Sequence, residues 1–250
     1  MFSFTRTRGW MFAASLALVL NAGAIIASAQ FDPSAQFSPV LNPNGVWTYG
    51  FESLPLGSPF NILPASIPVA SSPGPAINSW QVPALGLVGV FDNPTPVPQT
   101  VTTPGPEVSL FQPGELAMNT GPNDQFGIVQ FSAPAAGDYS IQGIFEGIDT
   151  AGTVSPVYLL WNNAPVATST VVGFGPSSDA PLSAGPFFLN VGDTLAYAVG
   201  GSPFNSMTAI LPGAQVAAVP EPASILLMSV AGFALLVFRP RRARFSSFEH

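Results

Sequence analysis

Proline constrains the fold of this chain more than any other residue type. The 250 residues include 28 Pro and 24 Gly. Between residues 54 and 114 prolines recur too often for a long helix or a central strand, because each one fixes φ and removes a backbone donor. Short apolar pieces at 85–91 and 108–111 are therefore predicted to be edge strands, with 93–106 as an exposed loop.

Strand patterns become clearer after residue 125. Tyr139, Ile141 and Phe145 alternate with polar residues, as in a strand with one buried face, although Ile144 breaks the alternation. Asn162-Asn163 separates two apolar runs in the manner of a hairpin turn. Further strands are predicted at 46–51, 126–131, 157–161, 166–172, 194–199 and 206–211, the last of which closes the domain.

These short strands with close turns predict an all-β protein, an antiparallel β-sandwich or jelly roll. We expect one secreted domain over residues 30–218, looser at 54–114 and firmer at 125–211. Disorder is the competing interpretation, because Gly and Pro are abundant. However, 47% hydrophobic residues and 20 Phe provide enough apolar surface for a core.

The N-terminus has the pattern of a secretory signal peptide. Arg6 and Arg8 precede an apolar run at 10–27, and Ala27 and Ala29 are the small residues that signal peptidase prefers before a cleavage site. Residues 1–29 are therefore predicted to be removed, which makes Gln30 the first mature residue. An uncleaved membrane anchor is the alternative.

The C-terminus combines three features in order: a Val219-Pro220-Glu221-Pro222 motif, an uncharged apolar run at 223–238, and a basic tail at 239–244. As a helix, the run would be about 24 Å long, slightly short of the bilayer's hydrocarbon core. Arginines that follow an apolar helix hold that end in the cytoplasm, so the preceding domain is expected outside. The arginines are Arg239, Arg241, Arg242 and Arg244.

This order of motif, helix and arginines resembles the PEP-CTERM sorting signal of Gram-negative bacteria (219–250 here), which a membrane-embedded exosortase processes. The resemblance implies exosortase and signal peptidase as partners during export, transient anchoring in the inner membrane, and a final place at the cell surface or in the extracellular matrix. It also implies a structural or adhesive role with exopolysaccharide. The stretch at 42–50 is similar to the beginning of the mature domain in one group of PEP-CTERM proteins. The later strands are similar to extracellular jelly-roll modules related to carbohydrate-binding domains.

Charge excludes several classes of partner. All six basic residues lie in the two terminal segments, so 31–219 contains no Lys or Arg. Eleven of the 13 acidic residues lie there, since only Glu221 and Glu249 fall outside. Such a domain cannot neutralise a phosphate backbone, which argues against nucleic acid. Cysteine is absent, so stability must come from a core without disulfides.

Missing residue types also argue against most enzymes. The single His, His250, is the last residue, and Lys and Cys are absent. Nucleophile–histidine schemes, Schiff bases and histidine or cysteine metal sites therefore lack their groups. A carboxylate pair for glycoside hydrolysis could combine Glu146 with Asp149 or Asp138. We expect no enzyme and name no catalytic residue.

Calcium is the one cofactor that the residue types allow, since it binds oxygen ligands. Asp124, Asp138, Asp149 and Asp193 occupy predicted turns. Asp is common in turns for backbone reasons alone, and no Asp-x-Asp-x-Asp loop occurs. Bound calcium is thus an open alternative to having no cofactor.

Aromatic and amide side chains offer a second possibility, a non-catalytic carbohydrate-binding module. Trp47, Tyr49, Trp161 and Asn162 are the candidate glycan contacts, with Trp80 and Asn163 as further members, because rings and amides suit sugars. Core packing is the competing use of each ring. A carboxylate-dependent glycoside hydrolase is the third alternative.

Overall fold

The computed structural model describes residues 28–220, except 86–87, 103–107 and 201–206. Within these residues the regular elements are strands and two short 3-10 helices. The strands are β1 Gln30–Phe31, β2 Trp47–Glu52, β3 Asn61–Ile62, β4 Ala65–Ser66, β5 Asn78–Gln81, β6 Gly89–Asp92, β7 Gln99–Thr102, β8 Val108–Phe111, β9 Leu116–Asn119, β10 Phe126–Ser132, β11 Gly137–Gly147, β12 Thr153–Trp161, β13 Ala164–Gly173, β14 Ala180–Leu189, β15 Thr194–Val199, β16 Thr208–Ile210 and β17 Gln215–Val219. The helices are η1 Pro83–Leu85 and η2 Gly175–Ser178.

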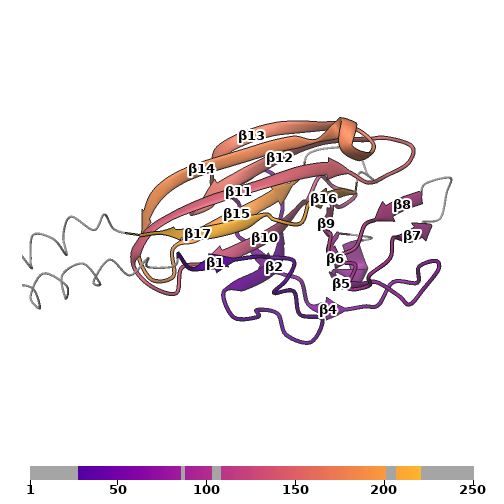
Figure 1. The fold of residues 1–250 in the computed structure, drawn as a ribbon, viewed down its shortest axis with the longest axis horizontal. Coiled ribbons are helices and arrows are strands. Elements are labelled where there is room, and N and C mark those ends of the chain that lie inside the picture. Colours follow the sequence, from indigo (N-terminus) through magenta and orange to yellow (C-terminus); the bar gives the residue numbers. More distant parts are fainter. Residues whose placement is uncertain (1–27, 86–87, 103–107, 201–206, 221–250) are drawn as a thin grey trace, which may run out of the picture. The chain divides into compact units, whose positions relative to one another are not determined.

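Two antiparallel sheets form the sandwich (Figure 1). The nine-stranded sheet has the order β1-β17-β11-β16-β9-β6-β5-β4, and β14 pairs with β11 as well. The six-stranded sheet has the order β13-β12-β15-β10-β2-β3, and β7 and β8 form a separate two-stranded sheet. The predicted all-β antiparallel fold is confirmed.

The main core lies between the two sheets and is rich in aromatic residues. Trp47 on β2, Phe131 on β10 and Tyr197 on β15 are fully buried. The Trp47 and Phe131 rings meet edge to face, with centroids 5.6 Å apart. Aromatic burial of this kind provides the stability that disulfides cannot supply here.

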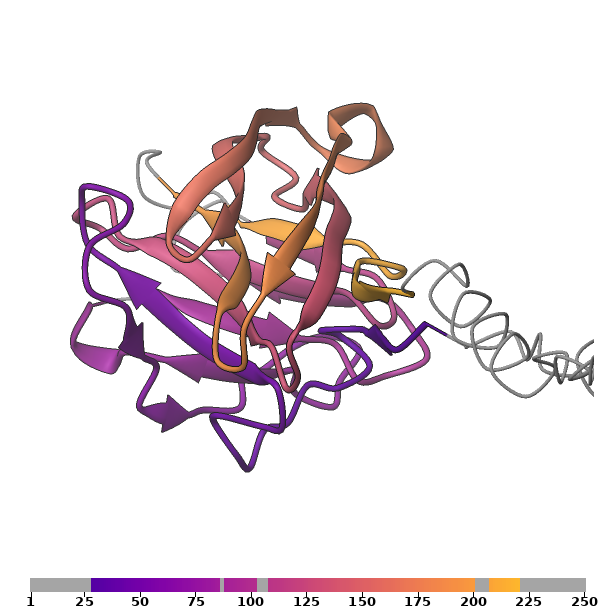
Figure 2. The ribbon, with the colours of Figure 1, turned by 90° about the vertical axis from the view of Figure 1, so that its left-hand side faces the viewer.

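Two smaller clusters cover the outer faces of the sheets. The β7–β8 hairpin places Val101 and Phe111 over Phe91 and Ala209 of the nine-stranded sheet. On the six-stranded sheet, the loop at 53–60 lays Phe60 so closely over Gly50 that a Cβ there would lie 2.1 Å from its Cζ. Gly50 is therefore required for close approach rather than for a turn. Figure 2 shows the first strands of the domain, in indigo and purple, below β13 and β14.

Several local predictions are confirmed. Tyr139, Ile141 and Phe145 are buried, whereas Ile144 is 40% exposed. Asn162 and Asn163 form a two-residue turn between β12 and β13 with φ of 46° and 64°, the left-handed conformation that such hairpins require. β8 and β15 have the predicted bounds.

The proline-rich half departs from the prediction. β5 and β6 are interior strands, because β5 lies between β4 and β6, and β6 lies between β5 and β9. The expected loop at 93–106 contains β7, and Asn93 is fully buried with its amide donating to the carbonyl oxygens of Val97, Phe111 and Gln112. Proline does not forbid these strands, because it lies in the connections around them.

The strand that closes the domain is β17 rather than the segment around β16. β17 pairs with β11 from Asp138↔Val219 to Gln142↔Gln215. On its other side β1 pairs with it at Gln30↔Ala217 and Phe31↔Val216, and the Phe31 ring packs against Phe131. The first and last strands of the domain are therefore neighbours (Figure 1).

Candidate functional site

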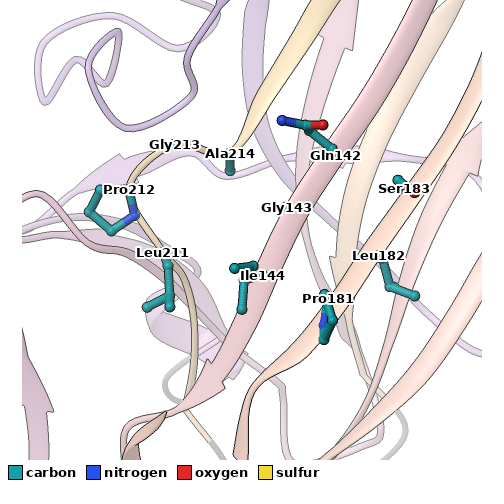
Figure 3. Close-up of a pocket in the computed structure, with 10 residues that line it drawn as sticks. All are labelled: Gln142, Gly143, Ile144, Pro181, Leu182, Ser183, Leu211, Pro212, Gly213 and Ala214. Atoms are coloured by element: carbon teal, nitrogen blue, oxygen red, sulfur yellow. The ribbon is translucent and has the colours of Figure 1, made fainter.

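A groove lies on the outer face of the nine-stranded sheet, above β11. Its volume is about 340 Å³. Figure 3 shows Ile144 of β11 between Pro181 of β14 and the loop that joins β16 to β17. The lining residues are Gln142, Gly143, Ile144, Pro181, Leu182, Ser183, Leu211, Pro212, Gly213 and Ala214.

Strand pairing builds this groove. Ile144 lies opposite Pro181 and Gln142 opposite Ser183, so that β11 and β14 contribute matched positions on one face. On the other side, the Leu211 N–H donates to the Ile144 carbonyl oxygen at 2.9 Å just where the chain leaves β16. The lining combines apolar side chains with one amide and one hydroxyl, and it contains no charged residue.

A group of carboxyls follows the groove along β11. Glu146 is two residues beyond Ile144 on the same face and is 8% exposed. Burial raises its pKa to about 7, and a hydrogen bond with the Asp179 carboxyl and the charges of Glu115 and Asp179 act in the same direction. Two carboxyls that share a hydrogen bond must hold a proton between them.

Glu115 completes this group from the end of the loop before β9. Its side chain is 1% exposed, and burial raises its pKa to about 7 although the Gln112 N–H donates to it at 2.6 Å. No cation in 31–219 can pair with Glu115 or Glu146, and at a pKa of about 7 roughly half of each carboxyl stays protonated at neutral pH. They can therefore donate hydrogen bonds near neutral pH.

The structure separates one of the two predicted carboxylate pairs, Glu146 with Asp138, by most of the length of β11. Asp179 is the carboxyl that hydrogen-bonds Glu146. Asp138 lies at the opposite end of β11, eight residues or about 26 Å away. Asp149 is 4% exposed and accepts hydrogen bonds from the Ser109 hydroxyl and from the Met207 N–H. Spacing along the sequence did not indicate these long-range neighbours.

The four aspartates considered for calcium do not come together in one group. Asp138 is at the start of β11, Asp124 is in a turn with φ of 58°, and Asp193 accepts from the Asn190 N–H at 2.7 Å. Hydrogen bonds from Asn190 and Asn162 lower the pKa of Asp193. Within the described residues, no three His, Cys, Asp or Glu side chains form a group that could hold a metal ion.

Two of the aromatic glycan candidates are wrong. Trp47 and Tyr49 are fully buried in the main core, so no ligand reaches them in the folded domain. The Trp47 indole N–H donates to Gln36 Oε1 at 2.7 Å. Trp80 is 8% exposed, and its indole N–H donates to the Ser38 carbonyl oxygen. Their inward positions follow from the strand period, and aromatic residue type alone did not reveal them.

Trp161 and Asn162 remain accessible. Trp161 is 36% exposed, and one face of its ring stacks on Phe187 with centroids 4.8 Å apart. The Asn162 amide ties two turns together, since its oxygen accepts from the Thr194 N–H at 2.8 Å and its nitrogen donates to Asp193 at 3.2 Å. Trp161 thus offers one free ring face, whereas the amide is already used.

Sequence reasoning missed the groove and Asp179. One signal did exist: Ile144 breaks the alternation of β11, and an apolar side chain on a solvent-facing position is the usual sign of a binding surface. No comparable signal marked Asp179, because its contact with Glu146 depends on the β11–β14 register.

Fold and tail together define an exported β-sandwich with a sorting signal. Residues 218–242 match the PEP-CTERM protein-sorting motif, and no curated protein matches the chain. The motif indicates a protein that exosortase sorts, with transient membrane anchoring and then a location at the cell surface or outside the cell.

Only the start of that motif lies in the described residues, where Val219 ends β17. The expected signal peptide, membrane helix and arginines lie outside these residues, apart from the predicted cleavage junction at Ala29-Gln30. No helix within 28–220, the described part, has the length and apolar character needed to cross a bilayer.

Proposed function

We propose that the sandwich is a non-catalytic module that binds neutral exopolysaccharide and so has a structural or adhesive role at the cell surface or in the extracellular matrix. The observation that carries this proposal is the uncharged groove above β11. The groove lies on an open sheet face, which suits a polysaccharide chain that extends beyond the groove at both ends.

The chemistry of the lining supports a hydroxylated, neutral ligand. Pro181, Pro212 and Ile144 offer apolar surface for the C–H faces of sugar rings, while Gln142 and Ser183 offer an amide and a hydroxyl for their hydroxyl groups. Eleven acids and no cation in 31–219 disfavour polysaccharides rich in uronic acids, because like charges repel.

A second binding position is the exposed ring face of Trp161. Its partial exposure favours stacking on a sugar. Asn162 supports this position less well than the sequence predicted, since its amide already bonds Thr194 and Asp193.

Glycoside hydrolysis is the third alternative, and the contact between Glu146 and Asp179 argues against it. A hydrolytic pair flanks the scissile bond with a separation of about 5 to 10 Å. Carboxyls that share a hydrogen bond are closer than that, so they leave no room for a sugar between them. Binding without turnover fits this geometry better.

The test is a binding isotherm of the exported protein on neutral and uronic-acid polysaccharides. Ile144→Asp puts a charge in the groove and is expected to weaken neutral-glycan binding at least about tenfold, since an unpaired charge near a desolvated contact costs more than 1.4 kcal/mol. Val154→Asp is the matched control, because Val154 is 53% exposed on β12, in the other sheet.

Other outcomes would redirect the proposal. Loss of binding in Trp161→Ala but not in Ile144→Asp would move the site to the other position. Release of reducing ends that stops in Glu146→Gln would contradict the non-catalytic assignment.

A further inference from the structure

Exposed apolar side chains gather at the end of the sandwich where β17 ends. Val219 and Phe188 flank Asp138 across the sheet, in the register Val219↔Asp138↔Phe188. Phe188 is 61% exposed and Val219 is 37% exposed. Such large side chains are costly to leave in water unless something covers them.

Two more apolar residues belong to the same end. Val191, 71% exposed, lies in the turn at 190–193, which is tied to the β10–β11 connection by a hydrogen bond from the Gly192 N–H to the Ala133 carbonyl oxygen. Trp161 is the last residue of β12 at this end, where its ring stacks on Phe187, which points to the opposite face of β14 from Phe188. We call Trp161, Phe188, Val191 and Val219 the exit surface.

Chain length limits what can lie against the exit surface. Val219 is hydrogen-bonded within the sheet as the last residue of β17, and the apolar run begins at Ala223. Four Cα steps span at most about 14 Å. While the run anchors the protein in the membrane, Val219 cannot lie farther than that from the start of the run.

We propose that the exit surface docks on the lipid headgroup region of the membrane during transient anchoring. Trp161 suits this position, because an indole prefers the boundary between apolar and wet regions. Asp138 and Asp193 lie at the same end and no cation occurs in 31–219, so anionic lipids repel this surface and zwitterionic lipids suit it.

The tether makes a weak contact sufficient. Four partly exposed side chains give little affinity to a free domain, whereas a tether of three residues holds them at an effective concentration in the millimolar range or above. Cutting the chain near Pro220 removes the tether. The contact then dissociates, so that a single cleavage both ends anchoring and frees the surface.

The chain has no cysteine, which permits a clean labelling experiment. The full chain carrying Val191→Cys is labelled with an environment-sensitive dye and reconstituted in phosphatidylcholine vesicles containing a headgroup-level quencher lipid. Val154→Cys is the matched control: it is also an exposed valine but lies near the start of β12, at the end opposite to Trp161. We expect quenching of the Val191 dye at least about threefold greater than that of the Val154 dye.

A second change tests the surface itself. Phe188→Asp in the Val191→Cys chain is expected to reduce the quenching to the level of the control, while near-ultraviolet circular dichroism verifies the fold. Equal quenching at both dye positions would overturn the proposal. A change in dye emission that requires exosortase would assign the surface to a protein partner and would overturn the proposal. A change that grows with protein concentration in the absence of lipid would assign it to a second copy of the chain and would equally overturn it.

Discussion

β11 presents a carboxyl on its outer face near each end, and the two environments are opposite. Asp138 is exposed between Val219 and Phe188. Glu146 is 8% exposed and hydrogen-bonded to Asp179. In a domain without cations no salt bridge is available, so water, hydrogen-bond donors or a bound proton must compensate each acid.

The hydrogen-bond partners at each end explain the difference. At the Asp138 end, N–H groups of Asn190 and Asn162 stabilise the ionised form of Asp193 and lower its pKa. At the Glu146 end, the neighbours are other carboxyls and burial raises the pKa values. Asp193 therefore stays charged, whereas Glu146 and Glu115 gain charge only as the pH rises toward neutrality.

Alanine at two glycines should give the largest contrast between these ends. A Cβ on Gly147 would lie 2.3 Å from the Gly173 carbonyl oxygen, whereas one on Gly192 meets nothing within 4 Å and only has to accept a φ of 89°. Gly147→Ala is expected to lower the free energy of unfolding by about 3 kcal/mol, and Gly192→Ala by about 1 kcal/mol. Urea unfolding measures both, and equal losses would contradict this description of the two ends.

Stability should fall as the pH rises. For an acid whose pKa is higher in the folded than in the unfolded protein, the folded state binds more protons between the two values, so unfolding becomes easier as the pH rises through that window. Glu115 and Glu146 reach about 7 and Asp92 about 6. From pH 5 to pH 8 the free energy of unfolding is expected to drop by about 2 kcal/mol through Glu115 and about 1 kcal/mol through Asp92, and Glu146 adds to this drop.

Substitutions separate the contributions to that slope. Glu115→Gln removes a titrating group and should flatten the decline between pH 5 and pH 8. Asp193→Asn should leave the slope between pH 5 and pH 8 unchanged, because a lowered carboxyl pKa gives stability that is lost only as the pH falls below the ordinary carboxyl range. A stability that rises from pH 5 to pH 8 would show that these acids are not buried in protonated form.

Neighbouring phenylalanines on β14 give the smallest contrast. Phe187 is partly buried and stacks on Trp161, so Phe187→Ser is expected to cost about 2 kcal/mol. Phe188 points outward, and Phe188→Ser should change stability by less than about 0.5 kcal/mol. Thermal unfolding of the two variants distinguishes them, and a larger loss for Phe188 would mean that the exit surface is part of the core.

The sequence could predict elements that depend on local residues, but not elements that depend on contacts between distant strands. The β12–β13 hairpin was predictable, because the Asn162-Asn163 turn and the strand period are local properties. β14 was not, since Pro181 and Pro186 disguise it, and an edge position is what allows a strand to carry them.

Long-range contacts account for the remaining errors. Residue type left a sugar contact open for Trp47 beside core packing, and the packing of two sheets decides for the core. The Glu146–Asp179 contact depends on register between strands about 35 residues apart. β17 was hidden because it runs directly into the sorting motif, whose match begins at residue 218.

The most direct test of the binding proposal is an amide chemical-shift titration of the exported protein with a soluble neutral polysaccharide. Saturable shifts centred on Gln142, Gly143, Ile144, Ser183 and Gly213 are the predicted result. Shifts centred instead on Trp161 and its turn, or no saturable shifts with any neutral polysaccharide, would contradict the assignment of the groove above β11 as the binding site.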